Sequence, residues 1–332
     1  MTAIYTVEPL LQEKIKKFLK DQRVPYGVFV AIDPFNGKVL ALVEQSRYSP
    51  RAKGWAERAT YPSASVFKLV TAAAALEEKK ASPDTMISFH GGLYRLKRNN
   101  WEDNPDRDIR KISLTEALAK SANVPFAKVA NRWLDNTTLL NYANAFGFNR
   151  PIPFEIPLQS SHAAIPEARK DLAYAAAGFG DTEMSPVHGA LIASAIGNGG
   201  DLIVPHLVDH IVDQEGKEVY SPKTEIMGHV VSQGTTSLLK EMMSQTIISG
   251  TSRRAFRRVH RTAVLRDITI GGKTGSLSGN DPPGKYSWFV GMAPLEKPEI
   301  AVAALVINNS HWRIKGSDLA KEGFFQYFKN RD

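Results

Sequence analysis

The sequence predicts an α+β fold in which an antiparallel sheet, flanked by N- and C-terminal helices, carries a large helical lobe inserted between its strands. Apolar runs with strand character stand near both ends of the chain, and helical patterns dominate between them. The runs are residues 27–32, 38–43, 267–275, 286–290 and 300–307. We therefore expect residues 1–45 and 267–332 to form a sheet lobe and residues 46–266 an inserted, mainly helical lobe, together making one domain.

The flanking helices and the first turn have ordinary local signals. Thr6 is placed to cap a helix with Pro9 in its first turn. Residues 33–37, Asp-Pro-Phe-Asn-Gly, have the chemistry of a hairpin turn and join the first two strands. Another helix is expected from Ser317 onward, after the last strand.

Within the inserted region, two helices are expected to meet at a polar junction. Ser113 and Glu116 form a capping box at the start of the first helix, and Pro125 suits the first turn of the second. Residues 121–123, Ser-Ala-Asn, lie between them, where polar side chains can point into a cleft. The Ser-x-Asn pattern recurs at residues 278–280 in a Gly/Pro-rich hairpin, so alone it identifies no site.

The composition is that of a globular protein. Of 332 residues, 43% are hydrophobic and 23% charged, which excludes disordered, collagen-like and coiled-coil chains. No apolar run approaches the length of about 18 residues that spans a bilayer, so we expect this chain, as given, to be soluble. The N-terminus lacks the basic and apolar regions of a signal peptide, so any export signal is expected outside this chain. Cysteine is absent, which excludes disulfides and thiolate chemistry.

The charge balance is modestly basic. Lys and Arg total 42 against 34 Asp and Glu, so the formal net charge is +8. This excess predicts a solvated basic surface, and no nucleic-acid partner is expected. The densest cluster of charge contains five arginines, for which a solvated face is the first interpretation and contact with an anionic ligand the alternative. They are Arg253, Arg254, Arg257, Arg258 and Arg261.

Ser65 and Lys68 stand three residues apart, so on a helix they are neighbours on one face and can exchange a proton. If Ser63 caps that helix, the backbone N–H of Ser65 has no partner inside it and lies at its positive end. A developing oxyanion could use both features. Ser237 and Lys240 match the same pattern, but we expect them past the first turn of their helix and predict no site there.

The Gly-Gly-Lys-Thr segment that contains Lys273 is not a phosphate-binding loop. The first glycine that such a loop needs is replaced by Asp267, and the residues after Thr274 cannot form the helix that would hold phosphate. On a strand, Lys273 lies on one side and the hydroxyls of Thr274 and Ser276 on the other. Gly275 between them would let a ligand approach the backbone.

Together the motifs are far more specific than alone. Ser121 follows Ser65 after 56 residues, and Lys273 follows after a further 152. This order of Ser-x-x-Lys, Ser-x-Asn and Lys-Thr-Gly resembles the penicillin-binding protein and serine β-lactamase superfamily. Further segments resemble the transpeptidase domain of high-molecular-mass penicillin-binding proteins over nearly the whole chain: residues 114–123, 144–148, 178–180, 185–186, 198–200 and 288–291. The implied fold is serine β-lactamase/transpeptidase-like.

The resemblance implies acyl transfer. Ser65 would attack the penultimate carbonyl of a peptidoglycan stem peptide ending in D-Ala-D-Ala, and an amine of a neighbouring stem would resolve the ester. Lys68 would be the base, and keeping a lysine half-neutral at about pH 7 costs about 4.6 kcal/mol. Burial, the helix end and the charge of Lys273 would all favour the neutral form.

The same resemblance implies roles for the other motif residues. Ser121 would relay the proton to the leaving nitrogen, Asn123 would contact the substrate amide, and Lys273 would support the relay and the substrate carboxylate. Backbone N–H groups of Ser65 and Ser276 would form the oxyanion hole. No metal, cofactor or His-based triad is implied. The implied substrate-binding residues are Thr274, Gly275 and Ser276.

Partners and location follow from the resemblance alone. We expect stem peptides ending in D-Ala-D-Ala and β-lactam antibiotics as ligands, with division or elongation proteins as candidate partners. The expected location is the periplasm, at the extracytoplasmic face of the bacterial inner membrane, and membrane contact would run through a segment absent from this chain. The chain would then be an excised catalytic domain, and whether the whole protein has a glycosyltransferase stays open. One departure is that the family's usual Pro-Gly before the nucleophile is replaced by Pro62-Ser63-Ala64.

Three alternatives stay open. Residues 155–159, Glu-Ile-Pro-Leu-Gln, faintly resemble the loop that carries the deacylating Glu of class A β-lactamases, but they also fit a segment of penicillin-binding proteins whose carboxylate is structural. A D,D-carboxypeptidase would differ only in resolving the ester with water. A β-lactam sensor or scaffold without activity is the third alternative, although the intact motifs favour an enzyme.

Overall fold

In the computed structural model the described residues are 1–49, 53–97, 99–259, 262–309, 311–329 and 331. They confirm the predicted α+β fold class, with a five-stranded antiparallel sheet in the order β13-β14-β15-β2-β3. The strands are β2 (Tyr26–Ile32), β3 (Val39–Ser46), β13 (Gly271–Asn280), β14 (Pro283–Ala293) and β15 (Ile300–Asn308). Since β3 and β13 form the two edges, the chain leaves the sheet at one edge and returns at the other.

Most of the sheet is buried on both faces, and the side chains of each strand alternate between the two faces. Phe29 and Ala31 of β2 pack in one cluster with helices α1 (Pro9–Asp21) and α10 (Gly316–Lys329). Val28 and Val30 face the opposite way, into a second cluster that includes α7 (Pro186–Gly197). Every residue of α7 is buried, which makes it the central helix beneath the sheet.

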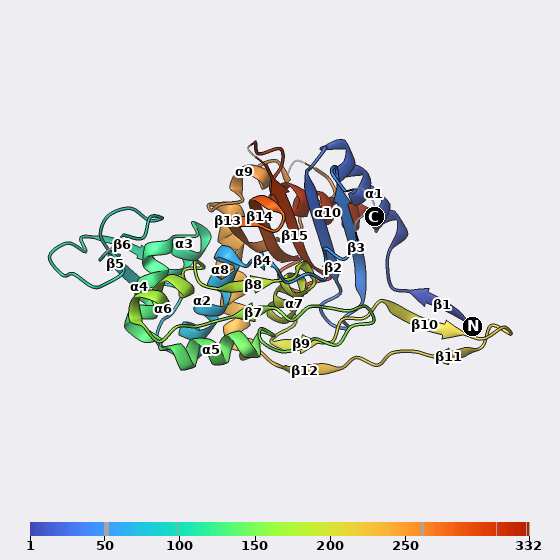
Figure 1. Cartoon of the computed structure of the whole chain (residues 1–332), viewed down its shortest axis with the longest axis horizontal. Coiled ribbons are helices and arrows are strands. Elements are labelled where there is room, and N and C mark those ends of the chain that lie inside the picture. The colour runs from blue at the N-terminus through green and yellow to red at the C-terminus, as the bar shows by residue number, and fades with distance from the viewer. Residues whose placement is uncertain (50–52, 98, 260–261, 310, 330, 332) are drawn as a thin grey trace.

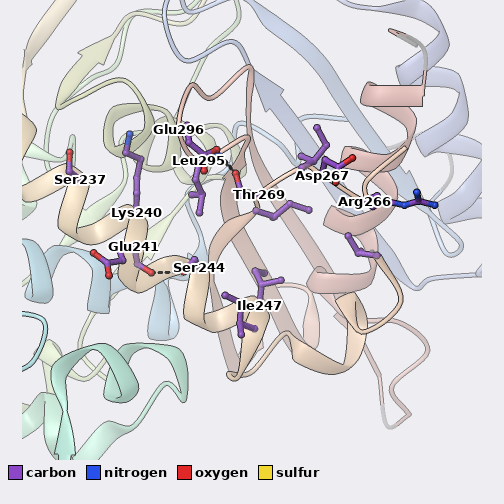
Figure 2. A pocket seen from close by; sticks show the side chains of 14 residues that line it. Ser237, Lys240, Glu241, Ser244, Ile247, Arg266, Asp267, Thr269, Leu295 and Glu296 are labelled. Carbon is purple, nitrogen blue, oxygen red and sulfur yellow. Dashed lines mark hydrogen bonds between the residues drawn. The ribbon is translucent and has the colours of Figure 1, made fainter. Parts of the chain in front are cut away.

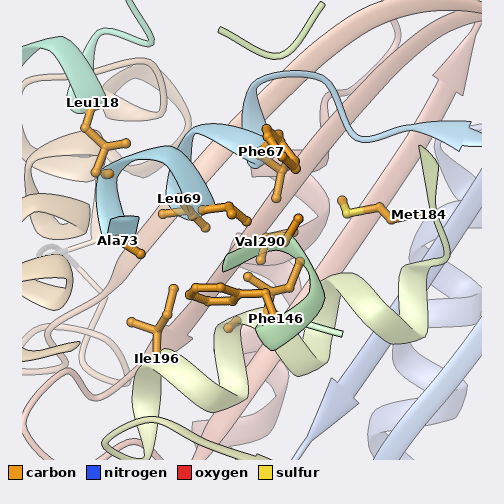
Figure 3. Close-up of a cluster of buried hydrophobic side chains, with 14 of the residues drawn as sticks. Phe67, Leu69, Ala73, Leu118, Phe146, Met184, Ile196 and Val290 are labelled. Atoms are coloured by element: carbon orange, nitrogen blue, oxygen red, sulfur yellow. The ribbon is translucent and has the colours of Figure 1, made fainter. Parts of the chain in front are cut away.

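The inserted region packs around the second cluster, which we call the central core. Phe67, Leu118, Phe146, Ile196 and Val290 meet there from separate elements, so the inserted helices and the sheet share one apolar interior (Figure 3). In Figure 1 most of these helices lie to the left of the sheet. They are η1 (Ala64–Phe67), α2 (Lys68–Glu77), α3 (Leu114–Ala119), α4 (Asn123–Trp133), α5 (Asn136–Ala145), α6 (Arg169–Ala176), α8 (Gln233–Ile248) and α9 (Arg253–Phe256).

Four small sheets were not predicted, since their strands are too short to show a periodic pattern. One of them, with β1 (Thr2–Tyr5), β10 (Val208–Val212) and β11 (Glu218–Tyr220), extends to the right in Figure 1. The strands of the other three are β4 (Tyr61–Pro62), β7 (His162–Ala163) and β8 (Thr182–Met184); β5 (Met86–Phe89) and β6 (Arg110–Ser113); and β9 (Asp201–Ile203) and β12 (Ile226–His229). Among the described residues, no helix is both long and apolar enough to cross a membrane.

Two predicted boundaries are wrong. The hydroxyl of Thr6 donates to the carbonyl oxygen of Val39 at 2.8 Å instead of capping a helix, and α1 begins only at Pro9. The first late strand, β13, begins at Gly271 and not at residue 267, and it continues to Asn280 in a hairpin with β14.

Other local predictions are confirmed. Ser113 Oγ accepts the backbone N–H of Glu116 at 3.1 Å at the start of α3, and residues 33–37 form the turn between β2 and β3, with Gly37 at a φ of 81°. The last helix, α10, begins at Gly316, one residue before the predicted start. The division into lobes of residues 1–45 with 267–332 and of residues 46–266 stays a prediction.

Candidate active site

Ser65 and Lys68 meet where η1 leads into α2. The Lys68 Nζ lies 2.8 Å from the Ser65 hydroxyl oxygen, as the spacing on a helical face requires. The Lys68 side chain is fully buried, and its Nζ also donates to Asn123 Oδ1 at 2.8 Å and to the carbonyl oxygen of Ala177 at 2.5 Å. The amine is therefore held in position by three segments of the chain.

The helix start differs from the prediction that Ser63 caps it. Ser63 makes no side-chain capping bond, and its Oγ pairs with Thr182 Oγ1 at 2.6 Å. The sharp turn comes from Ala64, whose φ of 49° lies in the left-handed region, at a cost of about 1–2 kcal/mol for a residue with a Cβ. Since η1 starts at Ala64, the N–H of Ser65 still lies in the first helical turn, where backbone donors have no acceptor inside the helix.

The electrostatics of the site favour a neutral Lys68. Burial lowers the pKa of Lys68 well below its ordinary value, and the charge of Lys273 lowers it further. Burial also lowers the pKa of Lys273 to about 7. The Phe126 ring, with its centroid 5.7 Å from Lys68 Nζ, acts in the opposite direction, but a single cation–π contact is small beside the desolvation of a fully buried ammonium. The arrangement presents an amine that can accept a proton from the neighbouring hydroxyl.

Ser121 and Lys273 form a second pair on the other side of the site. Ser121 follows α3 with a φ of 54°, another left-handed conformation for a residue other than glycine. Lys273 on β13 is fully buried, and its Nζ donates to Ser121 Oγ and to the carbonyl oxygen of Thr274, each at 2.8 Å. Such a strained backbone conformation persists only where the surrounding structure enforces it, and conformations of this kind are common at functional sites.

Asn123 links Lys68 to the cleft wall. It is the first residue of α4, so its side chain projects from the helix start and not from an exposed helical face. Its Oδ1 faces Lys68, and its Nδ2 donates to the carbonyl oxygen of Tyr94 at 2.6 Å. The backbone N–H of Asn123 also donates to the carbonyl oxygen of Leu93 at 2.8 Å, which fixes the orientation of the amide.

The motif residues open into one cleft of about 330 Å³, which we call the active-site cleft. Ser65, Ser121, Asn123, Thr274 and Ser276 all line it, so three distant stretches of the chain converge there. Sequence reasoning missed other lining residues, since nothing in their local pattern separates them from surface residues. These include Tyr94, Thr251, Lys315 and Ser317.

Strand β13 presents its hydroxyl side to the active-site cleft. Thr274 and Ser276 line the cleft, whereas Lys273 and Gly275 are buried on the other side. A Cβ at Gly275 would lie 3.2 Å from the carbonyl oxygen of Ser63. The absence of a side chain there lets β13 pack closely against the segment that precedes the nucleophile, and substrate binding at Gly275 stays a prediction.

Gly178 supports the same segment from the opposite direction. Its φ is +87°, and a Cβ there would lie 2.4 Å from the carbonyl oxygen of Ala64 and 3.0 Å from the backbone nitrogen of Ser65. Residues 178–180 carried part of the sequence resemblance, but the close approach of Gly178 to the Ser65 N–H has no signature in the sequence.

The second Ser-x-x-Lys match, at Ser237 and Lys240, and the glutamate Glu155 lie outside the active-site cleft. Ser237 Oγ donates to the carbonyl oxygen of Gln233 at 2.9 Å, and Ser237 and Lys240 line a separate pocket beside α8 (Figure 2). Glu155 Oε1 accepts the backbone N–H groups of Leu207 and Val208 at 2.9 and 3.1 Å, so its carboxylate has a structural role.

Potential metal ligands and the arginine cluster are the remaining side chains that bear on ligand binding. In the part of the chain that the structure describes, no three His, Asp or Glu side chains gather in a way that could hold a metal ion. Of the five clustered arginines, Arg261 lies outside the described residues.

A known protein family matches nearly the whole of this chain. The family model described as the penicillin binding protein transpeptidase domain matches residues 27–328. The peptidoglycan D,D-transpeptidase PbpA of Mycobacterium tuberculosis is 29% identical over 319 residues, which cover 86% of this chain and 62% of that protein. Penicillin-binding protein 3 of Bacillus subtilis is 25% identical, over 91% of this chain and 47% of that protein. The chain thus spans about half to three fifths of the length of these relatives.

Solved structures share the fold. The D,D-transpeptidase domain of a peptidoglycan glycosyltransferase from Eggerthella lenta superposes with a TM-score of 0.80 at 24% identity, covering 99% of this chain and 83% of that one. Penicillin-binding protein A from M. tuberculosis, as its penicillin G acyl-enzyme complex, gives a TM-score of 0.76 at 24% identity, with coverage of 99% and 80%. At these identities the likeness establishes the fold.

Proposed function

The chain belongs to the penicillin-binding protein transpeptidase domain family, and from this premise we propose that it is a peptidoglycan D,D-transpeptidase that works through an acyl-enzyme on Ser65. The observation that carries the proposal is the hydrogen bond of 2.8 Å between Ser65 Oγ and the fully buried amine of Lys68. The relatives named as D,D-transpeptidases and the related β-lactam acyl-enzymes support the same reaction class.

Lys68 acts as the general base. A neutral amine has two hydrogens and one lone pair, and Asn123 Oδ1 and the carbonyl oxygen of Ala177 accept the two hydrogens. The lone pair is then directed at the Ser65 hydroxyl. As the Ser65 Oγ–carbon bond forms to the penultimate D-Ala carbonyl, the serine proton moves to Lys68 Nζ.

Collapse of the tetrahedral intermediate completes acylation. The carbonyl oxygen carries negative charge, which the backbone N–H groups of Ser65 and Ser276 stabilise; one such donor is worth about 3–4 kcal/mol. The C–N bond to the terminal D-Ala breaks, and Ser121 relays to the leaving nitrogen the proton that Lys68 accepted from Ser65, while Lys273 holds the Ser121 hydroxyl. Thr274 and Ser276 hydroxyls bind the terminal carboxylate. An amine of a neighbouring stem then attacks the ester and forms the cross-link as the C–O bond to Ser65 breaks, and the proton lost by the amine returns to the Ser65 oxygen through Lys68.

Two neighbouring activities differ in how the ester is resolved. A class A β-lactamase needs a carboxylate that activates water at the ester, and Glu155 is engaged by the backbone of Leu207 and Val208 outside the active-site cleft. This observation disfavours the β-lactamase. A D,D-carboxypeptidase would use the same cleft with water as the acceptor, and a sensor or scaffold would catalyse neither the release of D-Ala nor cross-linking.

Substrates, partners and location follow the proposed reaction. We assign stem peptides ending in D-Ala-D-Ala as substrates, β-lactams as covalent inhibitors, and the extracytoplasmic face of the inner membrane as the place of action, with division or elongation proteins as candidate partners. The division into residues 1–45 with 267–332 and residues 46–266 is also a proposal. Its support is that the cleft residues Thr274 and Ser276 come from the first part and Ser65, Ser121 and Asn123 from the second.

The proposed function is tested by product analysis. The protein is incubated with a stem peptide ending in D-Ala-D-Ala that also bears its native free amine, and products are identified by mass spectrometry. Cross-linked peptide together with free D-Ala is expected. Shortened peptide without cross-links would make the enzyme a carboxypeptidase, and intact substrate would contradict an enzymatic role.

A further inference from the structure

The active-site cleft continues into a second, larger groove at one end. The two share the lining residues Thr251, Lys315 and Ser317, so they adjoin each other on the surface. This groove has a volume of about 760 Å³ and lies between the α9 segment and the start of α10. A strand bound at the site can therefore run from the cleft into it without leaving the surface.

The groove is strongly cationic, and we call it the basic groove. Its lining holds six basic side chains against one carboxylate, that of Asp318, which leaves a net charge of +5. Asp318 Oδ2 already accepts the backbone N–H of Lys315 at 2.9 Å. The basic residues are Arg254, Arg257, Arg258, Arg313, Lys315 and Lys321.

The two walls of the basic groove come from distant parts of the chain. Arg254, Arg257 and Arg258 lie in and just after α9, and all three are exposed. Arg313 and Lys321 come from residues that precede and form α10. Like charges that converge from two segments repel one another, and bound anionic groups would offset that repulsion. The first interpretation of the arginine cluster, a solvated basic face, would not require basic residues of a second segment to lie on the opposite wall of the groove.

The join between the cleft and the groove lies at the leaving-group end of the site. Thr251 Oγ1 is 2.6 Å from Thr274 Oγ1, the hydroxyl to which the proposed mechanism assigns the terminal carboxylate of the donor. After D-Ala departs, the acceptor amine must approach the ester from the position that D-Ala vacated. The strand that carries the amine must then extend away from that end, which is where the basic groove begins.

We propose that the basic groove binds the carboxylates of the acceptor peptidoglycan strand and so aligns its amine with the Ser65 ester, an inference that rests on the proposed transpeptidase function. Guanidinium groups bind carboxylates in a bidentate manner, and several of them along a groove match an acidic peptide. Trp312, which is 42% exposed, adds a flat apolar surface beside Lys315 in the same groove.

The test compares two acceptors on the same acyl-enzyme. The acyl-enzyme is formed with a thioester donor that lacks a free amine, and the acceptor is the un-cross-linked disaccharide peptide from peptidoglycan of the source bacterium. A second acceptor is the same compound with its carboxylates converted to amides and its amine kept free. The yields of transfer and of hydrolysis are measured by mass spectrometry, and the rate of Ser65 acylation is measured separately.

The wild-type protein is expected to transfer to the acidic acceptor about tenfold better than to the amidated one, with the preference falling as salt is added. The triple variant R254Q/R257Q/R258Q should lose the preference while its acylation rate stays unchanged. The matched control R47Q/R107Q/R253Q removes three exposed arginines that do not line the groove, and it should keep the preference.

Equal transfer to both acceptors by the wild-type protein, or equal loss of preference in the control variant, would overturn the inference. If the triple variant fails to fold, Lys321→Gln on the opposite wall takes its place. Its preference for the acidic acceptor should fall about twofold, and an unchanged preference would count against binding in the basic groove. Acylation with hydrolysis but no transfer to either acceptor would contradict both this inference and the transpeptidase function, but not the acyl-enzyme on Ser65. The absence of any acylation would contradict the acyl-enzyme as well. Equal transfer to both acceptors would contradict this inference alone.

Discussion

The charge of Lys273 on β13 lowers the pKa of Lys68 at the start of α2, although the two lysines stand 205 positions apart in the chain. Both are fully buried, and burial is the larger cause of the shift at Lys68. The fold thus brings a second basic group close enough to add to the effect of burial, which favours the neutral form of Lys68. In the proposed mechanism, this arrangement supplies the base for the hydroxyl of Ser65.

Removal of the Lys273 charge should move the pH dependence of acylation. The neutral form of Lys68 accepts the Ser65 proton, so acylation rises with pH through the pKa of Lys68. In Lys273→Met that pKa should rise because the repulsion is gone, although burial keeps it below its ordinary value. The rising limb of the acylation rate against pH, measured by stopped flow with a chromogenic β-lactam, should shift to higher pH. A limb at the wild-type position would show that Lys273 does not act on Lys68.

Asn123→Asp should shift the same limb through an added negative charge. Asn123 Oδ1 lies 2.8 Å from Lys68 Nζ, and an opposite charge this near raises a lysine pKa by about 1–3. Acylation at pH 7 should fall about tenfold or more and recover as the pH is raised. Asn123→Ala is the matched control, since it removes the amide without adding a charge and should not move the limb upward. The same pH profile in both variants would contradict the role of Lys68 as base.

Gly178→Ala should damage the site through the backbone. A Cβ there would lie 2.4 Å from the Ala64 carbonyl oxygen, so the Ala64–Ser65 peptide must move and the oxyanion donor with it. Acylation should fall about tenfold or more, since one such donor is worth about 3–4 kcal/mol. Gly216→Ala is the control, because Gly216 has a similar φ of +83° with no atom within 4 Å of the added Cβ. Equal effects of the two variants on acylation would show that the left-handed backbone alone is responsible.

Ala64→Gly should stabilise the protein. Ala64 has a φ of 49°, which glycine adopts without the penalty of a Cβ, so the free energy of unfolding should rise by about 1 kcal/mol. Urea denaturation measures the change, with the slope of the transition checked for two-state behaviour. A decrease in stability would mean that the methyl group, which is buried, contributes more packing energy than the backbone conformation costs.

The sequence predicted the sheet and the flanking helices well because their signals are local. The strand β2 shows this best, since an uninterrupted apolar run between turn residues has few alternatives. Short strands such as β4 (Tyr61–Pro62) escaped prediction because two residues have no periodicity. The start of α1 was misplaced because Thr6, a good capping residue, bonds instead to Val39, which is 33 positions away.

The active site likewise combines features that local sequence patterns predict with features that arise only from the tertiary fold. The distance between Ser65 and Lys68 follows from helical spacing, and the alternation of Lys273 and Thr274 follows from the strand. The carbonyl of Ala177 and the hydroxyl of Thr251 could not be predicted, because a backbone carbonyl has no signature in the sequence and Thr251 reaches the site only through the tertiary fold. The second wall of the basic groove escaped prediction for the same reason.

The most direct measurement of the central claim, that neutral Lys68 activates Ser65 as the nucleophile, is the intact mass of the protein after incubation with a labelled penicillin, followed by peptide mapping. We predict a single long-lived adduct on Ser65 that is absent in Ser65→Ala and forms far more slowly in Lys68→Ala than in the wild-type protein. An adduct that persists in Ser65→Ala, or that forms at the wild-type rate in Lys68→Ala, would contradict the account.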